Sequence, residues 1–253
     1  MPAQEAQPII SARGLGVEFY RSRRRRLQLR EMLFHGRSGA PKQTFWALRD
    51  VTFDIMPGDA VGLVGGNGGG KSTLLKMIAG VLLPDEGSVE VRAGVAPLIE
   101  LTGGFLGELS ARDNIHLTAG LHGLGKAEIE DRFDEIVDFA GPEVRAGLDT
   151  PYRHFSSGMK VRLGFSVVTT LDEPIILVDE VLAVGDRAFR EKCYQRMESL
   201  LADRKTLFLV SHSERDLRRF STRGLYLKRG ELMMDGPMED VLDRYNHDLD
   251  AGA

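Results

Sequence analysis

No run in this 253-residue sequence approaches 18 consecutive apolar residues, so we expect no transmembrane helix. Residues 1–10 also lack the basic and then apolar pattern of a secretion signal, so no secretion is expected. The single cysteine, Cys193, cannot form a disulfide within the chain, which is consistent with a reducing cytosol. The six histidines are scattered and form no convincing metal set with neighbouring Cys, Asp or Glu residues.

The chain also has little net charge, −4 at pH 7, which gives no reason to expect a nucleic-acid partner. Apolar residues make up 42% of the chain and charged residues 28%, as in an ordinary soluble protein with a real core. The charge is unevenly distributed, because residues 1–50 carry ten Lys or Arg and only four acidic residues. This basic N-terminal part suggests a local anionic partner.

Strand and helix signals alternate along the chain. Strands are expected at residues 8–20, 44–55, 60–64, 175–178 and 207–210. Helices are expected at 71–82, in the segment from Ser110 to Gly141-Pro142, from about Gly158, and between the last two strands. Short buried strands that alternate with helices predict an α/β fold with a mostly parallel sheet covered on both faces.

A phosphate-binding loop is predicted between the strand at 60–64 and the helix after it. It comprises Gly65, Gly66, Asn67, Gly68, Gly69, Gly70, Lys71, Ser72 and then Thr73. Glycines let backbone N–H groups surround phosphate oxygens, and the helix start adds its positive dipole end. Lys71 can reach the β- and γ-phosphates, and the Ser72 hydroxyl can bind Mg²⁺. The alternative is a flexible glycine-rich turn, but the flanking strand and helix favour nucleotide binding.

Acidic residues follow the buried strand at 175–178, at the end where a parallel sheet places its ligand chemistry. Asp179 can hold Mg²⁺ through water, and Glu180 can polarise a water for attack on the γ-phosphate. His212 follows the strand at 207–210 and could contact the same phosphate. Taken alone, these residues could also be a solvated acidic turn and a surface histidine, and it is the phosphate loop that favours catalysis.

The segment Phe155-Ser156-Ser157-Gly158-Met159 lies between the helical stretch and the strand at 175–178. There the chain resembles the ATP-binding cassette (ABC) ATPases, whose signature at this place is Leu-Ser-Gly-Gly-Gln. The resemblance covers nearly the whole chain. It implies that Ser156, Ser157, Gly158 and Met159 act on the nucleotide of a second subunit.

Other family positions are also identified through this resemblance. Asp186 corresponds to the aspartate of the D-loop, although Val181 stands where the family usually has proline. Glu100 falls near the glutamine of the Q-loop, which makes it a possible ligand of Mg²⁺. Tyr20 lies where an aromatic residue of the family stacks on adenine, and Phe45 or Trp46 could serve instead.

Within the family, the chain is similar to the ATPase subunits of polysaccharide exporters, which handle O-antigen, teichoic acid and related lipid-linked glycans. This similarity rests on the signature segment, on Asp179 to Asp186 with Phe189 and Lys192-Cys193, and on Phe45 to Asp50. The sequence also resembles actinobacterial members of the group, including mycobacterial-type galactan exporters.

The resemblance implies one ABC ATPase domain over residues 1–253. We expect a P-loop NTPase (RecA-like) core with a mostly parallel sheet and an antiparallel β-rich N-terminal part. Residues 1–105 would form the N-terminal part of this core, with a basic insertion at about 21–43. Residues 106–150 would form an inserted α-helical subdomain, and residues 151–253 the rest of the core.

The function implied is hydrolysis of ATP with Mg²⁺ by a homodimer that encloses two nucleotides. Because no membrane span is expected, the motion of the dimer must act on separate integral membrane permease subunits. These subunits would move a lipid-linked polysaccharide outward. The chain would then lie at the cytoplasmic face of the plasma membrane, held there by the permease.

The arginine-rich residues 21–30 have two interpretations. They can be a solvated loop, or a short amphipathic basic helix on which Leu29, Met32 and Leu33 form the apolar stripe. In the second case we expect the segment at the membrane interface, close to where the diphosphate of a lipid-linked glycan enters.

Other classes of protein fit the sequence less well. A P-loop GTPase needs an Asn-Lys-x-Asp motif, which the sequence lacks. A DNA-repair ABC ATPase would need coiled-coil arms or overall basic character. A purely regulatory ABC module would be expected to lack Lys71 or Glu180. An ABC transporter of another substrate, either an importer or a drug exporter, stays open.

Overall fold

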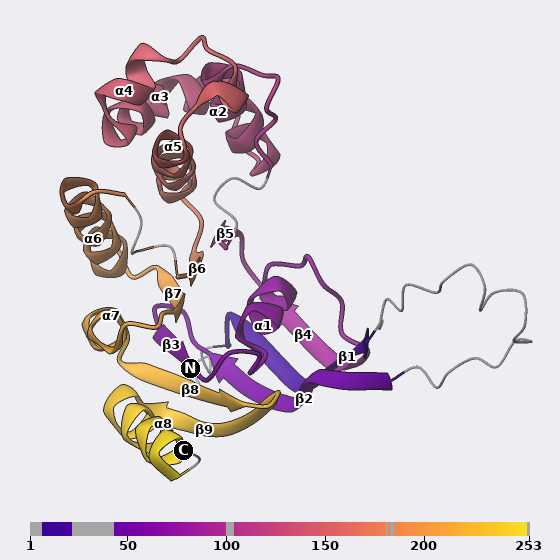
Figure 1. The fold of residues 1–253 in the computed structure, drawn as a ribbon. Helices are drawn as coiled ribbons and strands as arrows, with labels where there is room; N and C mark the ends of the chain where they lie inside the picture. Colours follow the sequence, from indigo (N-terminus) through magenta and orange to yellow (C-terminus); the bar gives the residue numbers. More distant parts are fainter. Residues whose placement is uncertain (1–6, 22–42, 100–103, 181, 183–184, 252–253) are drawn as a thin grey trace, which may run out of the picture.

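A computed structural model describes residues 7–21, 43–99, 104–180, 182 and 185–251 (Figure 1). Glu100 and the arginines from Arg23 to Arg30 lie outside these residues, so the expectations about them stay predictions. Within the described ranges, no helix is both long and apolar enough to cross a membrane.

The central sheet has six strands in the order β5-β6-β7-β3-β8-β9. The strands are β3 (Ala60–Val64), β5 (Val95–Leu98), β6 (Ile175–Asp179), β7 (Thr206–Val210), β8 (Arg223–Lys228) and β9 (Glu231–Pro237). All neighbours are parallel except β8 and β9, which form an antiparallel pair. The mostly parallel sheet expected from the sequence is therefore confirmed.

A second sheet has three antiparallel strands in the order β2-β1-β4. They are β1 (Ile10–Arg21), β2 (Gln43–Ile55) and β4 (Glu86–Val91). The antiparallel N-terminal part is thus confirmed. Several register shifts interrupt the pairing of β1 with β2, between Ala12 and Glu18.

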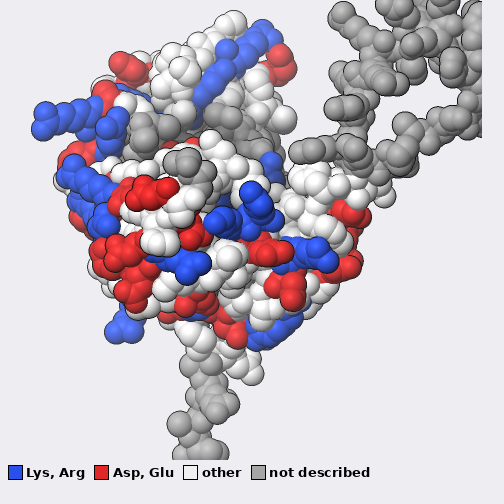
Figure 2. Space-filling model, turned by 60° about the horizontal axis from the view of Figure 1, so that its bottom comes forward, with Lys and Arg blue, Asp and Glu red and all other residues white. Residues whose placement is uncertain are grey.

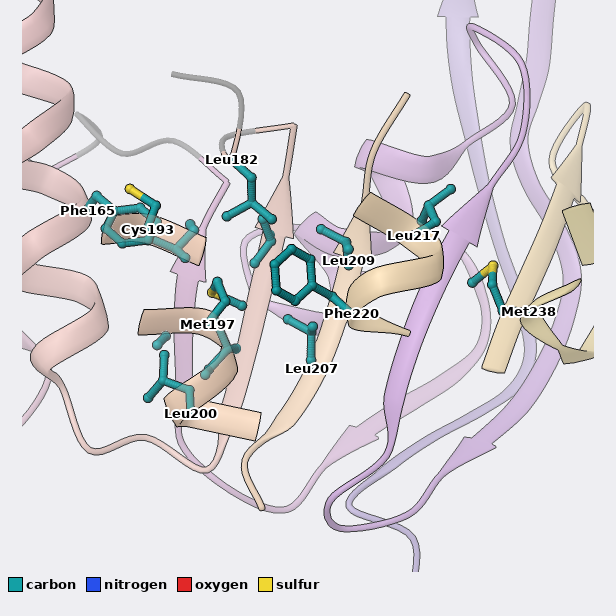
Figure 3. Packing of buried hydrophobic residues seen from close by; sticks show 14 of the residues in the cluster. Phe165, Leu182, Cys193, Met197, Leu200, Leu207, Leu209, Leu217, Phe220 and Met238 are labelled. Atoms are coloured by element: carbon teal, nitrogen blue, oxygen red, sulfur yellow. The ribbon is translucent and has the colours of Figure 1, made fainter. Parts of the chain in front are cut away.

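Side chains of the central strands alternate between two apolar cores, because successive residues of a strand point to opposite faces. On β6, Ile175 and Leu177 join the core beneath β1, β2 and α1 (Lys71–Ile78). Ile176 and Val178 join the opposite core, part of which is drawn in Figure 3. That second core is covered by α5 (Ser157–Thr170), α6 (Arg187–Ala202), α7 (Glu214–Phe220) and α8 (Met238–Ala251). Both faces of the sheet are buried, as predicted.

The middle of the chain forms α2 (Ala111–Leu121), α3 (Lys126–Ala140), α4 (Pro142–Ala146) and the short 3₁₀ helix η1 (Tyr152–His154). These helices gather beyond the edge strand β5, at the top of Figure 1. Their apolar cluster includes Leu163 and Val167, so α5 packs with them. Ser110, where the sequence predicted the helical segment to begin, caps α2 by accepting a hydrogen bond from the Asp113 N–H at 3.0 Å.

Two helix boundaries differ from the sequence prediction. The helix α1 ends at Ile78 instead of reaching Leu82, and Val81, beyond its end, is 75% exposed. Gly80 adopts a φ of 71° there, which ends the helix as a left-handed residue commonly does. Pro142 follows the end of α3 and also begins α4. At the first position of a helix the backbone N–H has no partner within the helix, so a proline loses no hydrogen bond there.

Charged side chains of both signs are interspersed on the face seen in Figure 2. Many charged residues in the C-terminal part of the chain are paired. Arg223 contacts Asp235 at 2.6 Å, and Arg219 contacts Glu198 at 2.6 Å. Ion pairs that are exposed to solvent contribute about 0–1 kcal/mol each, so pairs near the surface shape it more than they stabilise the fold.

Candidate functional site

Three neighbouring parallel strands end at one edge of the central sheet. The strand β7 lies between β6 and β3, and all three run in the same direction. The phosphate loop follows β3, Asp179 and Glu180 stand at the end of β6, and His212 follows β7. The fold therefore brings these groups together although they are far apart in the sequence.

At some positions of the phosphate loop, the backbone conformation and the close neighbours leave room only for glycine. Gly70, the N-cap of α1, has a φ of 102°, and a Cβ there would lie 2.5 Å from the Ala47 carbonyl oxygen. Gly65 has a φ of 154°, and its Cβ would lie 2.2 Å from the Leu227 oxygen. Gly66 has no atom within 4 Å of its would-be Cβ, so there the loop is open.

Alanine substitutions should separate these two kinds of glycine. We expect Gly70→Ala to lower the free energy of unfolding by about 1–3 kcal/mol, because the new Cβ meets fixed backbone at a left-handed φ. Gly66→Ala, as the matched control, should leave that free energy unchanged. Urea denaturation of the two variants measures the difference. Equal stability of both would contradict the loop geometry.

Lys71 is buried at the start of α1, with only 8% of its surface exposed. Its Nζ donates hydrogen bonds to the carbonyl oxygens of Gly65 at 2.7 Å and Gly66 at 3.0 Å. Burial lowers the pKa of Lys71, whereas the nearby carboxylates of Glu180 and Asp179 raise it. The ammonium group is thus held inside the curve of the loop, beside the two acids.

Asp179 lies half-buried and touches the first turn of α1. Burial raises the pKa of Asp179, and a hydrogen bond from the Ser72 side chain acts in the opposite direction. A carboxylate and a hydroxyl side by side supply the oxygen ligands that Mg²⁺ prefers. The described residues hold no cluster of three or more His, Cys, Asp or Glu that could bind a metal alone. The pair therefore fits a Mg²⁺ that takes its other ligands from water and nucleotide phosphates.

The side chains of Glu180 and His212 are in contact, with 2.7 Å between Glu180 Oε1 and His212 Nε2. The Glu180 backbone has a φ of 57°, a left-handed conformation that costs a residue with a Cβ about 1–2 kcal/mol. Its N–H donates to the Val210 oxygen at 3.0 Å, which ties the end of β6 to β7. Side chains of both residues remain about half exposed, so they can reach a ligand.

An open pocket of about 250 Å³ lies over the loop. The residues that line it are Phe19, Phe45, Ala47, Glu180 and the loop from Asn67 to Thr73. The rings of Phe19 and Phe45 lie 6.0 Å apart between centroids, on paired strands. Both could therefore contact a base whose phosphates lie in the loop.

Tyr20 is not among the described residues that line this pocket. It follows Phe19 on β1, so its side chain points to the opposite face of the sheet. Of the three aromatic residues considered from the sequence, Phe45 is the one at the pocket. Phe19, the second ring at the pocket, was not predicted from the sequence.

The signature residues lie elsewhere, at the start of α5. Ser156 is the N-cap and accepts a hydrogen bond from the Met159 N–H at 3.2 Å. A Cβ at Gly158 would meet only the Ser156 side chain, at 3.9 Å, so the helix start is open. Ser156, Ser157, Gly158 and Met159 do not line the pocket over the loop.

Asp186 is the N-cap of α6 and accepts a hydrogen bond from the Phe189 N–H at 2.8 Å. That bond lowers the pKa of Asp186 most, and Arg162 lowers it further. Arg162 donates to the Asp186 carboxylate at 2.5 Å, which joins α5 to α6. Asp186 thus lies beside the signature helix and outside the pocket.

Comparisons with known proteins agree with this arrangement. The family model described as ABC transporter matches residues 48–183. The O-antigen export system ATP-binding protein RfbB of Klebsiella pneumoniae is 38% identical, over 86% of this chain and 89% of that protein. The teichoic acids export ATP-binding protein TagH of Bacillus anthracis is 36% identical, over 88% of this chain and 39% of that protein.

Among solved structures, the dimeric ATP-binding cassette MJ0796 bound to ADP and Pi has a TM-score of 0.71. It shares 22% identity and covers 90% of this chain and 98% of its own, so it shows the fold alone. The predicted P-loop NTPase fold is thereby confirmed. The family match covers more than half of the chain, and the O-antigen relative is similar over most of its length. We conclude that this chain belongs to the ABC transporter family and carries its ATPase domain.

Proposed function

We propose that the chain is the ATP-hydrolysing subunit that powers export of a lipid-linked polysaccharide through a separate permease. The observation that carries the ATPase part is the convergence of the phosphate loop, Asp179-Glu180 and His212 on three adjacent strand ends. Parallel sheets bind their ligands at this edge, and a loop with a buried lysine beside two acids suits a nucleoside triphosphate.

The substrate class rests on the relatives. The O-antigen protein is named for an export system, and the teichoic acid protein also carries an export name. With these two export names beside the resemblance in the sequence, a lipid-linked glycan is the substrate class that we propose for this chain. Galactan is the narrower expectation from the sequence.

The reaction proposed is attack of water on the γ-phosphorus of ATP. The loop N–H groups and Lys71 would bind the phosphates and offset their charge. Glu180 would orient the water and accept its proton, and His212, at 2.7 Å from Glu180, would hold that carboxylate in place. The bond from the γ-phosphorus to the bridging oxygen then breaks, which leaves ADP and phosphate.

Mg²⁺ would be held by Ser72 and Asp179, whose side chains already touch. It would offset charge on the phosphate oxygens when bound. Glu100, the other possible ligand from the sequence, lies outside the described residues.

A second copy of the chain would complete each site. In this proposal Ser156 and Gly158, at the open start of α5, contact the γ-phosphate bound by the partner copy through hydroxyl, N–H and helix dipole. Two ATPs would then hold a symmetric dimer at the cytoplasmic face of the membrane, where integral permease subunits bind it. Asp186, tied to α5 by Arg162, would lie near the junction of the two copies.

Deletion of the gene in its source cell tests the export function. We expect surface polysaccharide to fall and its lipid-linked precursor to accumulate inside the cell. The wild-type chain should restore export, and Lys71→Ala should not, because it removes the cation that binds phosphate. Quantifying surface glycan and extracted precursor measures both effects. Unchanged surface glycan after deletion would overturn the proposed substrate class.

A further inference from the structure

Asn114, on the first turns of α2, is fully buried with 0% of its surface exposed. Its side chain bonds the backbone of the segment before the helix. The Leu106 N–H donates to Asn114 Oδ1 at 2.7 Å, and Asn114 Nδ2 donates to the oxygens of Leu106 at 2.9 Å and Ser110 at 2.9 Å. A longer contact of 3.3 Å reaches the Leu109 oxygen.

This set of partners permits only one orientation of the amide. The Leu106 N–H can only donate, so it must be bonded by the amide oxygen of Asn114. The three carbonyl oxygens can only accept, so they must face the amide nitrogen. One side chain thus bonds both backbone groups of Leu106 and the Ser110 oxygen, beside the backbone bond from the Leu109 N–H to the Leu106 oxygen at 3.2 Å. We call residues 106–110 the braced segment.

The braced segment also bonds the residues that lead into the signature. The Tyr152 N–H donates to the Leu109 oxygen at 2.8 Å, and the Arg153 N–H donates to the Gly107 oxygen at 3.0 Å. Ser110 and Pro151 form a β-bridge. The side chains of Arg153 and Glu108 form an ion pair beside these bonds.

From there the chain reaches Ser156 in a few residues that are also fixed. The Phe155 N–H donates to the Tyr152 oxygen at 3.0 Å, and the Phe155 ring is buried in the helical cluster. Ser156 then caps α5. A continuous series of bonds therefore runs from Asn114 through the braced segment and η1 to the signature serine.

We propose that Asn114 is a positioning residue for Ser156. By ordering the braced segment, it fixes the surface on which η1 is built and so the place from which α5 begins. The inference rests on the proposed role of Ser156 at the partner's nucleotide. Loosening the brace then displaces Ser156 from that nucleotide while the chain's own phosphate loop keeps its shape.

Asn114→Ala tests this role, and Thr118→Ala is the matched control. Thr118 lies one turn further on α2, is 8% exposed, and its buried hydroxyl has no hydrogen-bond partner among the described residues. Both variants remove a buried polar group from α2, but only the first removes the brace. If Asn114→Ala does not fold, Asn114→Asp replaces it, because its second oxygen opposes the carbonyls that the amide bonded.

Three measurements are made on the full chain: amide hydrogen exchange, binding of a fluorescent ATP analogue, and steady-state hydrolysis. For Asn114→Ala we expect faster exchange at the Arg153 and Met159 N–H groups, unchanged binding of the analogue, and kcat lower by about 10- to 100-fold. Thr118→Ala should keep exchange at these two amides and keep kcat. If Asn114 had a merely structural role, its replacement would lower stability, but it would not lower kcat while binding of the analogue stays unchanged.

The proposal is overturned if Asn114→Ala leaves the Arg153 and Met159 amides protected, or if kcat stays at the value of Thr118→Ala. Ser156→Arg distinguishes these failures from failure of the proposed function. If Ser156→Arg abolishes hydrolysis and Asn114→Ala does not, only the positioning role is wrong. If Ser156→Arg itself hydrolyses ATP normally, the proposed role of the signature is wrong.

Discussion

Glu180→Gln is expected to lower ATP hydrolysis by about 10²- to 10⁴-fold while ATP binding persists. Glutamine matches the size of glutamate and can still bond His212, which lies 2.7 Å from the carboxylate. It cannot accept the proton of the attacking water. Lys71 and the loop backbone, which would bind the phosphates, are unchanged, so the dimer with bound ATP should accumulate. Phosphate release and size-exclusion chromatography with ATP measure the two effects.

The protein offers a matched control in a second Glu–His pair. Glu130 Oε1 lies 3.2 Å from His116 Nε2, on the helices beyond β5 and away from the pocket. Glu130→Gln makes the same chemical change in a similar pair, and we expect its hydrolysis rate to equal that of the wild type. Near-normal turnover in Glu180→Gln would refute the assignment of Glu180.

The strands β6 and β7 could be predicted because burial on both faces leaves a local signal. Residues 175–178 and 207–210 are uninterrupted apolar runs, and both lie in strands with buried side chains on each side. By contrast, β4 (Glu86–Val91) and β9 have largely exposed or half-exposed residues, including Gly and Pro. The pairing of β4 with β1, far earlier in the chain, and of β9 with β8, across the turn at Arg229-Gly230, supplies the strand conformation.

Site residues could be predicted where they lie in the segment that directly follows a buried strand. Asp179 and His212 come directly after such runs, and Lys71 ends the glycine-rich loop that follows β3, so their place at the edge of the sheet follows from topology. The choice between Phe19 and Tyr20 could not be made this way. Register shifts between Ala12 and Glu18 change which side chains of β1 face the core, and no sequence period records them.

Asn114 shows a different limit of sequence reasoning. A single asparagine inside a helical pattern carries no signal of the backbone groups that it bonds. Its four contacts depend on how the segment before α2 folds back over the helix, which only the structure reveals. Buried amides of this kind are therefore found from hydrogen-bond partners and burial.

Mixing two inactive variants should restore part of the ATPase activity. Lys71→Ala removes the cation that would bind phosphate, and Ser156→Arg places a bulky charge at the open start of α5. Each homodimer then has a lesion in both of its sites, so each variant alone should be inactive. A mixed dimer has one site with both lesions and one with neither. If subunits exchange freely and the sites fire independently, hydrolysis should reach at most about a quarter of the wild-type rate.

The measurement is hydrolysis across mixing ratios, with ATP-driven dimerisation followed for each variant and for the mixture. Activity should peak at equal amounts, because only there is the mixed dimer most abundant. Mixed dimers that form without any activity would show that the two sites are strictly coupled. Full hydrolysis by a monomer at high dilution would contradict the shared site itself, because Ser156 does not line its own chain's pocket.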